Sequence, residues 1–369
     1  MEFLNKVKHF NALASAITFL VLIPLIMLIF NFMQTFEERR EKIGFIILGD
    51  IKVPGWNKSH YQGIKAACEN FGLPLLVKNG IKENTGQCPE AIKDLAKNGV
   101  SMICFASYAY AIEARDLVND YPGVAFATIS AENHAKNMTA YFVRIYQGRY
   151  LSGALAGMKT KSNIIGYVAA KPNTEVKRGI NAFTLGVQRT NPQAKVLVMW
   201  TNSWQDDEIE TKHAQRLIEE GADVLTYHQN KDVTARVAEK FGVDYIAFNE
   251  ILSGRSEHYL TSVVCHWDLY YSEVIQRYLK GELNSEKNYW MGIERGAIML
   301  SDYSPSVTKE MILQLDSLKQ ELISGNLIFW GEIYDNEGNI RCQADEAISD
   351  DKLLEDMNWL VKGVEVLDD

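Results

Sequence analysis

"IGFIILGDIKVPGWNKSHYQGIKAACENFG", residues 43–72, is the stretch that decides the fold. It starts with a short apolar run, continues through a loop, and then places apolar residues at three-to-four spacing up to Gly72. This pattern predicts a buried strand followed by a helix that ends at a left-handed glycine. A strand, a loop and a helix in this order form the repeating unit of parallel α/β folds.

The same unit recurs along the chain. Strands are predicted at 43–48, 75–77, 101–105, 124–129, 164–169, 195–199, 224–226 and 245–248. Amphipathic segments separate them, and glycines such as Gly99, Gly221 and Gly242 close these segments just before a strand. Alternation of this kind predicts parallel sheets with helices on both faces.

A second series of strand and helix units begins at residue 164, which indicates two lobes. We expect an α/β protein with two doubly wound lobes, of residues 42–160 and 161–285, and C-terminal segments of residues 286–369 that recross between the lobes.

The C-terminal segments are less regular than the rest of the chain. The sequence predicts an amphipathic helix that ends at Gly325, a hairpin that turns at residues 335–338, and a closing helix within residues 350–363.

Residues 1–36 are predicted to be a transmembrane anchor, joined to the lobes by a charged linker of residues 37–41. Residues 10–36 contain no charge, and about 20 apolar residues suffice to cross a membrane. Lys6 and Lys8 precede them, which favours an N-terminus inside the cell and an extracytoplasmic remainder. A cleaved signal peptide is the alternative, although its apolar region is typically shorter.

Composition excludes several classes of protein. The net charge of −9, with acidic and basic residues mixed along the chain, argues against binding to nucleic acid. The five cysteines have no C-x-x-C spacing, and their odd number leaves at least one thiol unpaired within the chain. Nucleotide-phosphate, hydrolase and zinc-protease motifs are missing from the sequence. We therefore expect no catalytic residues, no metal and no cofactor.

Aromatic residues follow several predicted strands, at the sheet edge where open α/β sheets bind ligands. Trp56 follows the first strand, Trp204 follows the strand at 195–199, and Trp267 follows "TSVVCHW". A flat ligand could be held between one ring from each lobe, since base–aromatic stacking is worth about 1–3 kcal/mol per base. Packing beneath a loop is the alternative role for Trp56, and a helix cap is the alternative role for Asn57.

With these features the chain resembles the basic membrane protein family of extracytoplasmic solute-binding proteins, which includes purine nucleoside receptors of ABC importers. The resemblance covers about residues 42–345. It is carried by "GWNKSHYQG", "YFVRIYQGRYLSGALAGMKTKSNIIGYVAA", "RGINAFTLGVQRTNP", "TNSWQDDEIE", "LIEEGADVL" and "LTSVVCHWDLYY". It implies a fold of the type I periplasmic-binding-protein class.

The resemblance also implies site residues. Trp56 and Asn57 match a Phe-Asn pair that stacks on the purine and contacts its edge, and Trp204 matches the second ring. Tyr146 falls near an acidic position that contacts the base.

Two sugar-binding groups of the nucleoside receptors are replaced here. An Asp becomes Asn249, and a Lys position is occupied by Cys265. Trp267 and His228 are expected to narrow that end of the cleft. The chain is therefore similar to the family's Gly-Trp-Asn branch, which implies a free adenine-like nucleobase as ligand, with a nucleoside as the alternative.

The expected function is the solute-binding component of an ABC importer, with a permease as its partner and a location at the cell membrane. A membrane-anchored sensing subunit that signals to a membrane partner is the alternative. An enzyme acting on nucleobases is the third hypothesis, and it lacks a nucleophile or metal constellation in the sequence.

Overall fold

The computed structural model describes residues 23, 25–28, 41–129, 135–251, 256–283, 285 and 289–368. Residues 1–42 form one unit and residues 43–369 form another. Apart from residues 23 and 25–28, the predicted anchor at 10–36 lies outside the described residues. Within the described ranges, no helix has both the length and the apolar character needed to span a membrane.

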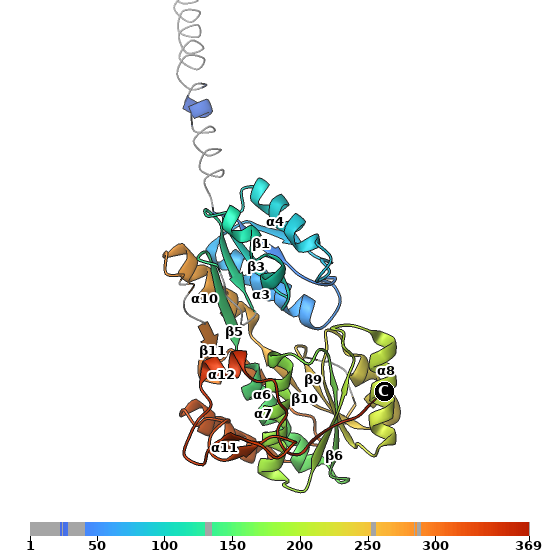
Figure 1. The fold of residues 1–369 in the computed structure, drawn as a ribbon. Coiled ribbons are helices and arrows are strands. Elements are labelled where there is room, and N and C mark those ends of the chain that lie inside the picture. Colours follow the sequence, from blue (N-terminus) through green and yellow to red (C-terminus); the bar gives the residue numbers. More distant parts are fainter. Residues whose placement is uncertain are drawn as a thin grey trace, which may run out of the picture. The chain divides into compact units, whose positions relative to one another are not determined.

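The sheet of the first lobe contains six of the described strands, in the order β11-β5-β4-β3-β1-β2 (Figure 1). Their bounds are β1 (Ile43–Ile46), β2 (Leu75–Lys78), β3 (Met102–Phe105), β4 (Ala125–Thr128), β5 (Met138–Val143) and β11 (Tyr289–Met291). All neighbouring pairs are parallel. The helices of this lobe are α3 (Trp56–Phe71), α4 (Gln87–Lys97), α5 (Tyr110–Glu113) and α10 (Trp267–Leu279), and α10 packs on α3.

The sheet of the second lobe has the order β12-β10-β9-β8-β6-β7-β15. Its strands are β6 (Ile164–Ala169), β7 (Lys195–Trp200), β8 (Val224–His228), β9 (Asp244–Phe248), β10 (Tyr259–Cys265), β12 (Ile298–Leu300) and β15 (Val364–Val366). Only the pairing of β10 with β12 is antiparallel among these described strands. Its helices are α6 (Ile145–Lys159), α7 (Thr174–Thr190), α8 (Asp207–Glu219), α9 (Val233–Phe241) and α11 (Lys309–Ile323).

The chain passes between the lobes in three described connections: from β5 to α6, from β10 to α10, and from β11 to β12. The expected lobe boundaries near residues 160 and 285 lie one helix later in the chain than the first two crossings. Two-lobed α/β architecture is confirmed, and it places the carboxyl ends of strands from both sheets at the interface between the lobes.

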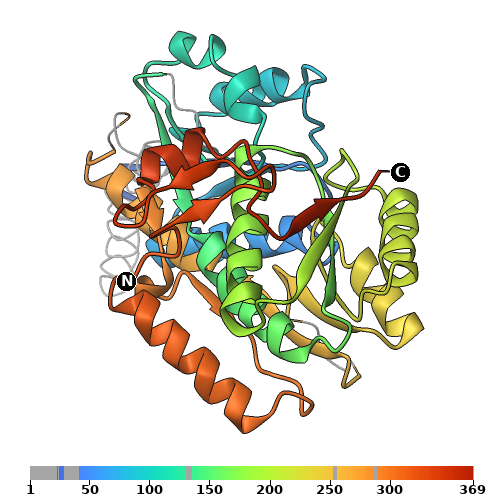
Figure 2. The same ribbon diagram turned by 60° about the horizontal axis from the view of Figure 1, so that its bottom comes forward.

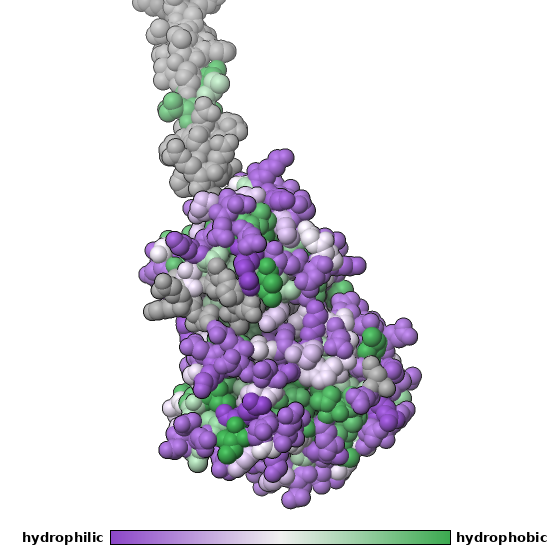
Figure 3. Space-filling model, in the orientation of Figure 1, coloured by the Kyte–Doolittle hydropathy of each residue, from purple (hydrophilic) through white to green (hydrophobic). Residues whose placement is uncertain are grey.

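The cores of both lobes lie around strands that are buried on both faces. Every residue of β1 and β3 is buried, as expected for parallel strands covered by helices on both sides. All five cysteines are buried free thiols. The face shown in Figure 3 is mainly hydrophilic, with scattered hydrophobic residues.

Helices α6 and α7 of the second lobe cross at glycines. A Cβ atom at Gly153 would lie 1.9 Å from the carbonyl oxygen of Phe183, and one at Gly186 would lie 2.0 Å from that of Tyr150. These two glycines are therefore required for the helix backbones to touch.

The C-terminal segment ends differently from the sequence expectation. Helix α11 and the hairpin of β13 (Ile333–Tyr334) and β14 (Ile340–Cys342) occur where they were predicted. The closing helix α12 covers only Asp350–Glu355, and the chain then joins the second sheet as β15, beside β7 (dark red in Figure 2). The side chain of Asn181 bonds the backbone of Trp359 and Val361, which holds this segment extended.

Candidate functional site

A cavity lies between the two lobes, at the carboxyl ends of strands from both sheets. From the first lobe it is lined by Leu48, Trp56, Ser107, Tyr108 and Ile129. From the second lobe it is lined by Glu175, Trp204, His228, Gln229, Asn230 and Phe248. The volume of this cavity, as available to water, is about 20 Å³. Since one water needs about 10–15 Å³ by that measure, the cavity is narrow.

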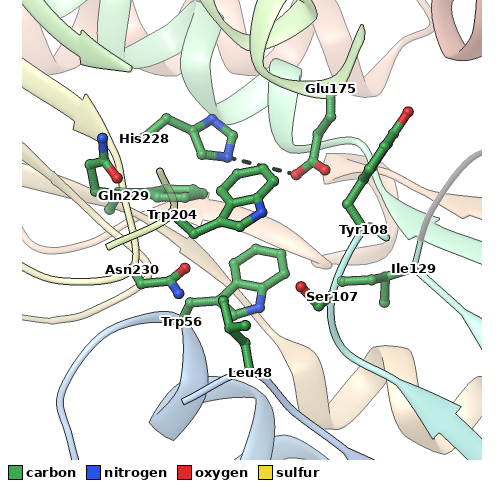
Figure 4. Close-up of a pocket in the computed structure, with 11 residues that line it drawn as sticks. Leu48, Trp56, Ser107, Tyr108, Ile129, Glu175, Trp204, His228, Gln229 and Asn230 are labelled. Atoms are coloured by element: carbon green, nitrogen blue, oxygen red, sulfur yellow. Dashed lines mark ion pairs between the residues drawn. The ribbon is translucent and has the colours of Figure 1, made fainter. Parts of the chain in front are cut away.

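Trp56 is the first residue of α3 and forms the first-lobe wall of this cavity (Figure 4). Its side chain is only 9% exposed, and its indole Nε1 donates a 3.0 Å hydrogen bond to the carbonyl oxygen of Ala106. Behind it, ring centroids of His60 and Trp267 lie 4.2 and 5.3 Å away. Trp56 is therefore a rigid ring that packs on the first-lobe core and also faces the cavity.

His60 and Trp267 support Trp56 from the helix pair α3 and α10. Their rings stack at 3.6 Å between centroids, and His60 Nδ1 lies 2.7 Å from the hydroxyl of Tyr271. Burial keeps the pKa of His60 well below its ordinary value, so this ring is neutral. The Trp56 ring is therefore packed on one side and lines a cavity on the other, a geometry that suits both of the roles expected from the sequence, ligand plate and packing.

Trp204 lies opposite, in the loop between β7 and α8 of the second lobe. It is partly buried, and its indole Nε1 donates a 3.0 Å hydrogen bond to Glu83 of the first lobe. The loop is ordered by Asp206, whose carboxylate caps α8 by accepting hydrogen bonds from the backbone N–H groups of Glu208 and Ile209. Figure 4 shows the Trp204 indole above that of Trp56.

The backbone of Asn230 joins the two tryptophan segments. Its N–H donates to the carbonyl oxygen of Trp204 at 2.9 Å, and its carbonyl oxygen accepts from the N–H of Trp56 at 3.3 Å. At Gly55, which has a φ of 115°, an added Cβ would lie 2.0 Å from this carbonyl oxygen. The lobes are therefore in direct backbone contact beside the cavity.

Glu175 and His228 are two of the polar residues that the second lobe contributes to the wall. Glu175 lies in the first turn of α7, and its Oε1 is 3.6 Å from Nε2 of His228 (dashed in Figure 4). The Glu175 carboxylate also interacts electrostatically with the buried guanidinium groups of Arg178 and Arg149. Burial lowers the pKa of His228, although Glu175 partly offsets this, so the ring is neutral near neutral pH. The cavity thus offers carboxylate oxygens as hydrogen-bond acceptors between two aromatic rings.

Three of the seven predicted site residues line this cavity: Trp56, Trp204 and His228. Asn57 does not, because its Oδ1 accepts from the backbone N–H of Gly49 at 3.2 Å and orders the loop after β1. Gly55, two residues before Asn57, is the N-cap of α3.

Tyr146 also lies elsewhere, near a different pocket of the second lobe and the C-terminal segment. Its hydroxyl accepts a 2.8 Å hydrogen bond from Arg144, and its ring packs against Trp290 and Phe329. Tyr146, in the first turn of α6, therefore lies among residues of β11 and the C-terminal segment.

Asn249 and Trp267 line a second, more open cavity together with Gly55, Cys265 and His266. The amide nitrogen and oxygen of Asn249 are both buried and meet no hydrogen-bond partner in the described part of the chain. Trp267, the first residue of α10, is only 1% exposed, because its ring packs on Trp56 and His60 of α3. Gly55 lines this second cavity, and Asn230, which its backbone contacts, lines the first.

Sequence reasoning missed Glu175, Asn230 and Glu83. Glu175 follows Asn173, the side-chain cap of α7, and an acid at this place is commonly explained by the helix dipole alone. Its position after β6, at the edge where ligands bind, was the available signal. No group of three or more His, Cys, Asp or Glu side chains suited to a metal occurs in the described ranges.

Comparison with known proteins places the chain in a family. The model of the family "ABC transporter substrate-binding protein PnrA-like" matches residues 40–340. A purine-binding protein of Brucella abortus (strain 2308) is 32% identical over 335 residues, covering 89% of this chain and 94% of that protein. A putative ABC transporter glucose-binding protein of Haloferax volcanii is 29% identical over 332 residues, covering 89% of this chain and 81% of that protein.

Solved structures share the two-lobed fold. A transcriptional activator of the comK gene from Bacillus halodurans superposes with a TM-score of 0.67 at 23% identity, over 77% of this chain and 98% of that chain. An ABC transporter solute-binding protein from Aeropyrum pernix K1 superposes with a TM-score of 0.65 at 16% identity, over 77% of this chain and 92% of that chain. With residues 40–340 matched, the chain belongs to the PnrA-like family of ABC transporter substrate-binding proteins, which are solute-binding proteins and not enzymes.

Proposed function

We propose that this protein captures a purine-like nucleobase, with adenine as the type, between Trp56 and Trp204 and presents it to an ABC permease. The observation that carries the proposal is the pairing of these two indoles, one from each lobe, on opposite walls of one cavity. A flat aromatic ligand gains most from such an arrangement, since each base–aromatic stack is worth about 1–3 kcal/mol.

The edge of the base would be recognised by Glu175. A carboxylate accepts hydrogen bonds, and that of Glu175 lies 3.6 Å from the ring of His228 at the cavity wall. A ligand that brings N–H groups to this wall would therefore be favoured. The amino group of adenine satisfies this requirement, whereas the corresponding carbonyl oxygen of hypoxanthine would face the carboxylate unfavourably.

A free base fits the surroundings better than a nucleoside. The described residues that line the cavity between the tryptophans include no lysine or aspartate to hold a sugar diol. Asn249 and Cys265, at the positions of the sugar-binding groups in the resemblance, line the neighbouring cavity beyond Gly55. A ribose would have to cross the contact between Gly55 and Asn230.

Entry of the ligand requires a motion of the lobes. A cavity of about 20 Å³ is too small for a purine, so Trp56 and Trp204 must move apart to admit the ligand. We propose that the two sheets with their helices move as two bodies about the three crossing connections, and that closure is the state recognised by the permease. An anchor at residues 10–36 would keep the extracytoplasmic protein beside that permease.

Titration calorimetry of the full chain in mild detergent tests the ligand. The panel is adenine, guanine, hypoxanthine, adenosine and glucose, the last because of the Haloferax relative. We expect adenine to bind most tightly. Tighter binding of adenosine than of adenine would overturn the choice of a free base, and binding of glucose without any purine would overturn the ligand class.

A further inference from the structure

Glu83 lies in the loop between β2 and α4 and is not part of the cavity wall. Its side chain is only 5% exposed. One carboxylate oxygen, Oε1, accepts hydrogen bonds from groups of its own lobe: the Ser107 hydroxyl at 2.6 Å and the backbone N–H of Ala109 at 2.9 Å. These two bonds fix the carboxylate at the end of β3, next to the cavity.

The other oxygen, Oε2, bonds the opposite lobe. It accepts from the Lys171 ammonium at 2.9 Å and from the Trp204 indole N–H at 3.0 Å. Lys171 follows β6, and its ammonium lies 5.6 Å from the centroid of the Trp204 ring. One carboxylate therefore holds the ring that we propose as the second plate, together with a cation of the same lobe.

The charge of Glu83 matches this arrangement. Burial by itself would raise the pKa of the carboxyl, but hydrogen bonds from Ser107, Ala109 and Lys171 outweigh it and bring the pKa below its ordinary value. All four partners are hydrogen-bond donors, so the ionised carboxylate satisfies each of them. Separation of the lobes would break only the Oε2 bonds, because Oε1 and its partners move together.

In this ion pair the Glu83 side chain is buried and that of Lys171 is 33% exposed, which sets it apart from fully exposed surface pairs. Exposed pairs contribute little, because water and salt screen them. A buried charge that loses its partner is costly, so a contact of this type biases one conformation strongly over another.

We propose that Glu83 is a positioning residue for the purine clamp, which holds the Trp204 ring in place and joins it to lobe closure through Lys171. This inference rests on the proposed function for the role of Trp204 as a plate. It goes further because it attributes the stability of the closed state to a carboxylate that does not touch the ligand.

The test compares Glu83→Gln with Glu90→Gln. Glu90 is a matched control, since its carboxylate also lies 2.8 Å from a lysine, Lys93, but both belong to α4 of the first lobe. Glu83→Gln keeps the size of the side chain and places an amide against donors. Lobe closure is measured on the full chain by the distance between two spin labels, one in each lobe, without and with adenine.

We expect Glu83→Gln to shift the label distances toward the open state without ligand and to weaken adenine binding by about tenfold or more, as for loss of a charged hydrogen bond. Glu90→Gln should change neither. Lys171→Met should open the lobes in part, and adding it to Glu83→Gln should have no further effect, since both remove the same contact.

Unchanged label distances in Glu83→Gln would overturn the proposal. If Glu83→Gln failed to fold, Lys171→Met and Trp204→Phe, which removes the indole N–H but keeps a ring, would test the same contact. If the wild type bound no purine, the proposed ligand would fail, whereas the distances without ligand would still decide whether Glu83 holds the lobes together.

Discussion

Trp204→Ala should weaken ligand binding with little loss of folding stability, whereas Trp56→Ala should lower both. Trp204 is a partly buried loop residue whose side chain bonds Glu83. Its removal should weaken adenine binding about 5- to 150-fold, the equivalent of one stack worth about 1–3 kcal/mol. The free energy of unfolding should fall by only about 1–2 kcal/mol, because part of the roughly 1.5–3 kcal/mol of a fully buried large side chain is at stake.

Trp56 differs because its ring is 9% exposed and its indole bonds the backbone of Ala106. Trp56→Ala should therefore cost about 3–5 kcal/mol of unfolding free energy, as for other buried aromatic residues, besides its loss of ligand binding. This burial removes the value of Trp56→Ala as a clean test of stacking.

Titration calorimetry with adenine measures the change in binding affinity, and urea unfolding followed by circular dichroism measures the change in the free energy of unfolding. Trp204→Phe is the matched control: it keeps a stacking ring but loses the indole bond to Glu83, so its affinity should lie between those of Trp204→Ala and the wild type. The reasoning is refuted if Trp204→Ala binds adenine as tightly as the wild type, or if it lowers stability as much as Trp56→Ala does.

Three further substitutions probe charge and pH. Glu175→Gln replaces one acceptor oxygen by a donor and should weaken adenine binding about tenfold by calorimetry, with an unchanged melting temperature in the absence of ligand; unchanged affinity would contradict the assigned role. Burial raises the pKa of Glu210 to about 7, so the folded state keeps a proton that the unfolded chain releases and loses stability as pH rises toward 7. Glu210→Gln should therefore raise the melting temperature at pH 8 far more than at pH 5 in scanning calorimetry, and equal gains would contradict this. Burial lowers the pKa of His60, so as the pH falls below about 6.5 the unfolded chain binds a proton that the folded protein does not, and the wild type loses stability. His60→Phe should reduce this dependence of the melting temperature on pH below about 6.5. An unchanged dependence would contradict the prediction.

Local patterns in the sequence were sufficient for the two-lobed fold. Apolar runs, three-to-four spacing and glycines at helix ends are set by neighbouring residues, and they predicted strands such as β1 and β6 closely. The rule that ligands bind at the carboxyl ends of parallel strands then pointed to Trp56, Trp204 and His228, which the structure brings to one cavity.

The remaining site residues depend on tertiary packing that no local pattern contains. Glu83 acts from a loop, and its partners Lys171 and Trp204 are about 90 and 120 positions away. Tyr146 occupies a suitable position in the chain, but the packing of α6 directs it toward Trp290. Asn57 turns back to its own loop, since the N–H of Gly49 needs a partner there.

The absence of a side chain at Gly55 has a consequence for transport experiments. Because a methyl group there would collide with the carbonyl of Asn230, Gly55→Ala would act as a spacer that holds the lobes apart, beyond the strain that its φ of 115° imposes. Cells carrying this variant would present the permease with a receptor that meets its ligand but cannot complete the closed shape. Uptake that continued in such cells would mean that the permease accepts the open form, whereas lost uptake with retained protein would identify closure itself as the transport signal.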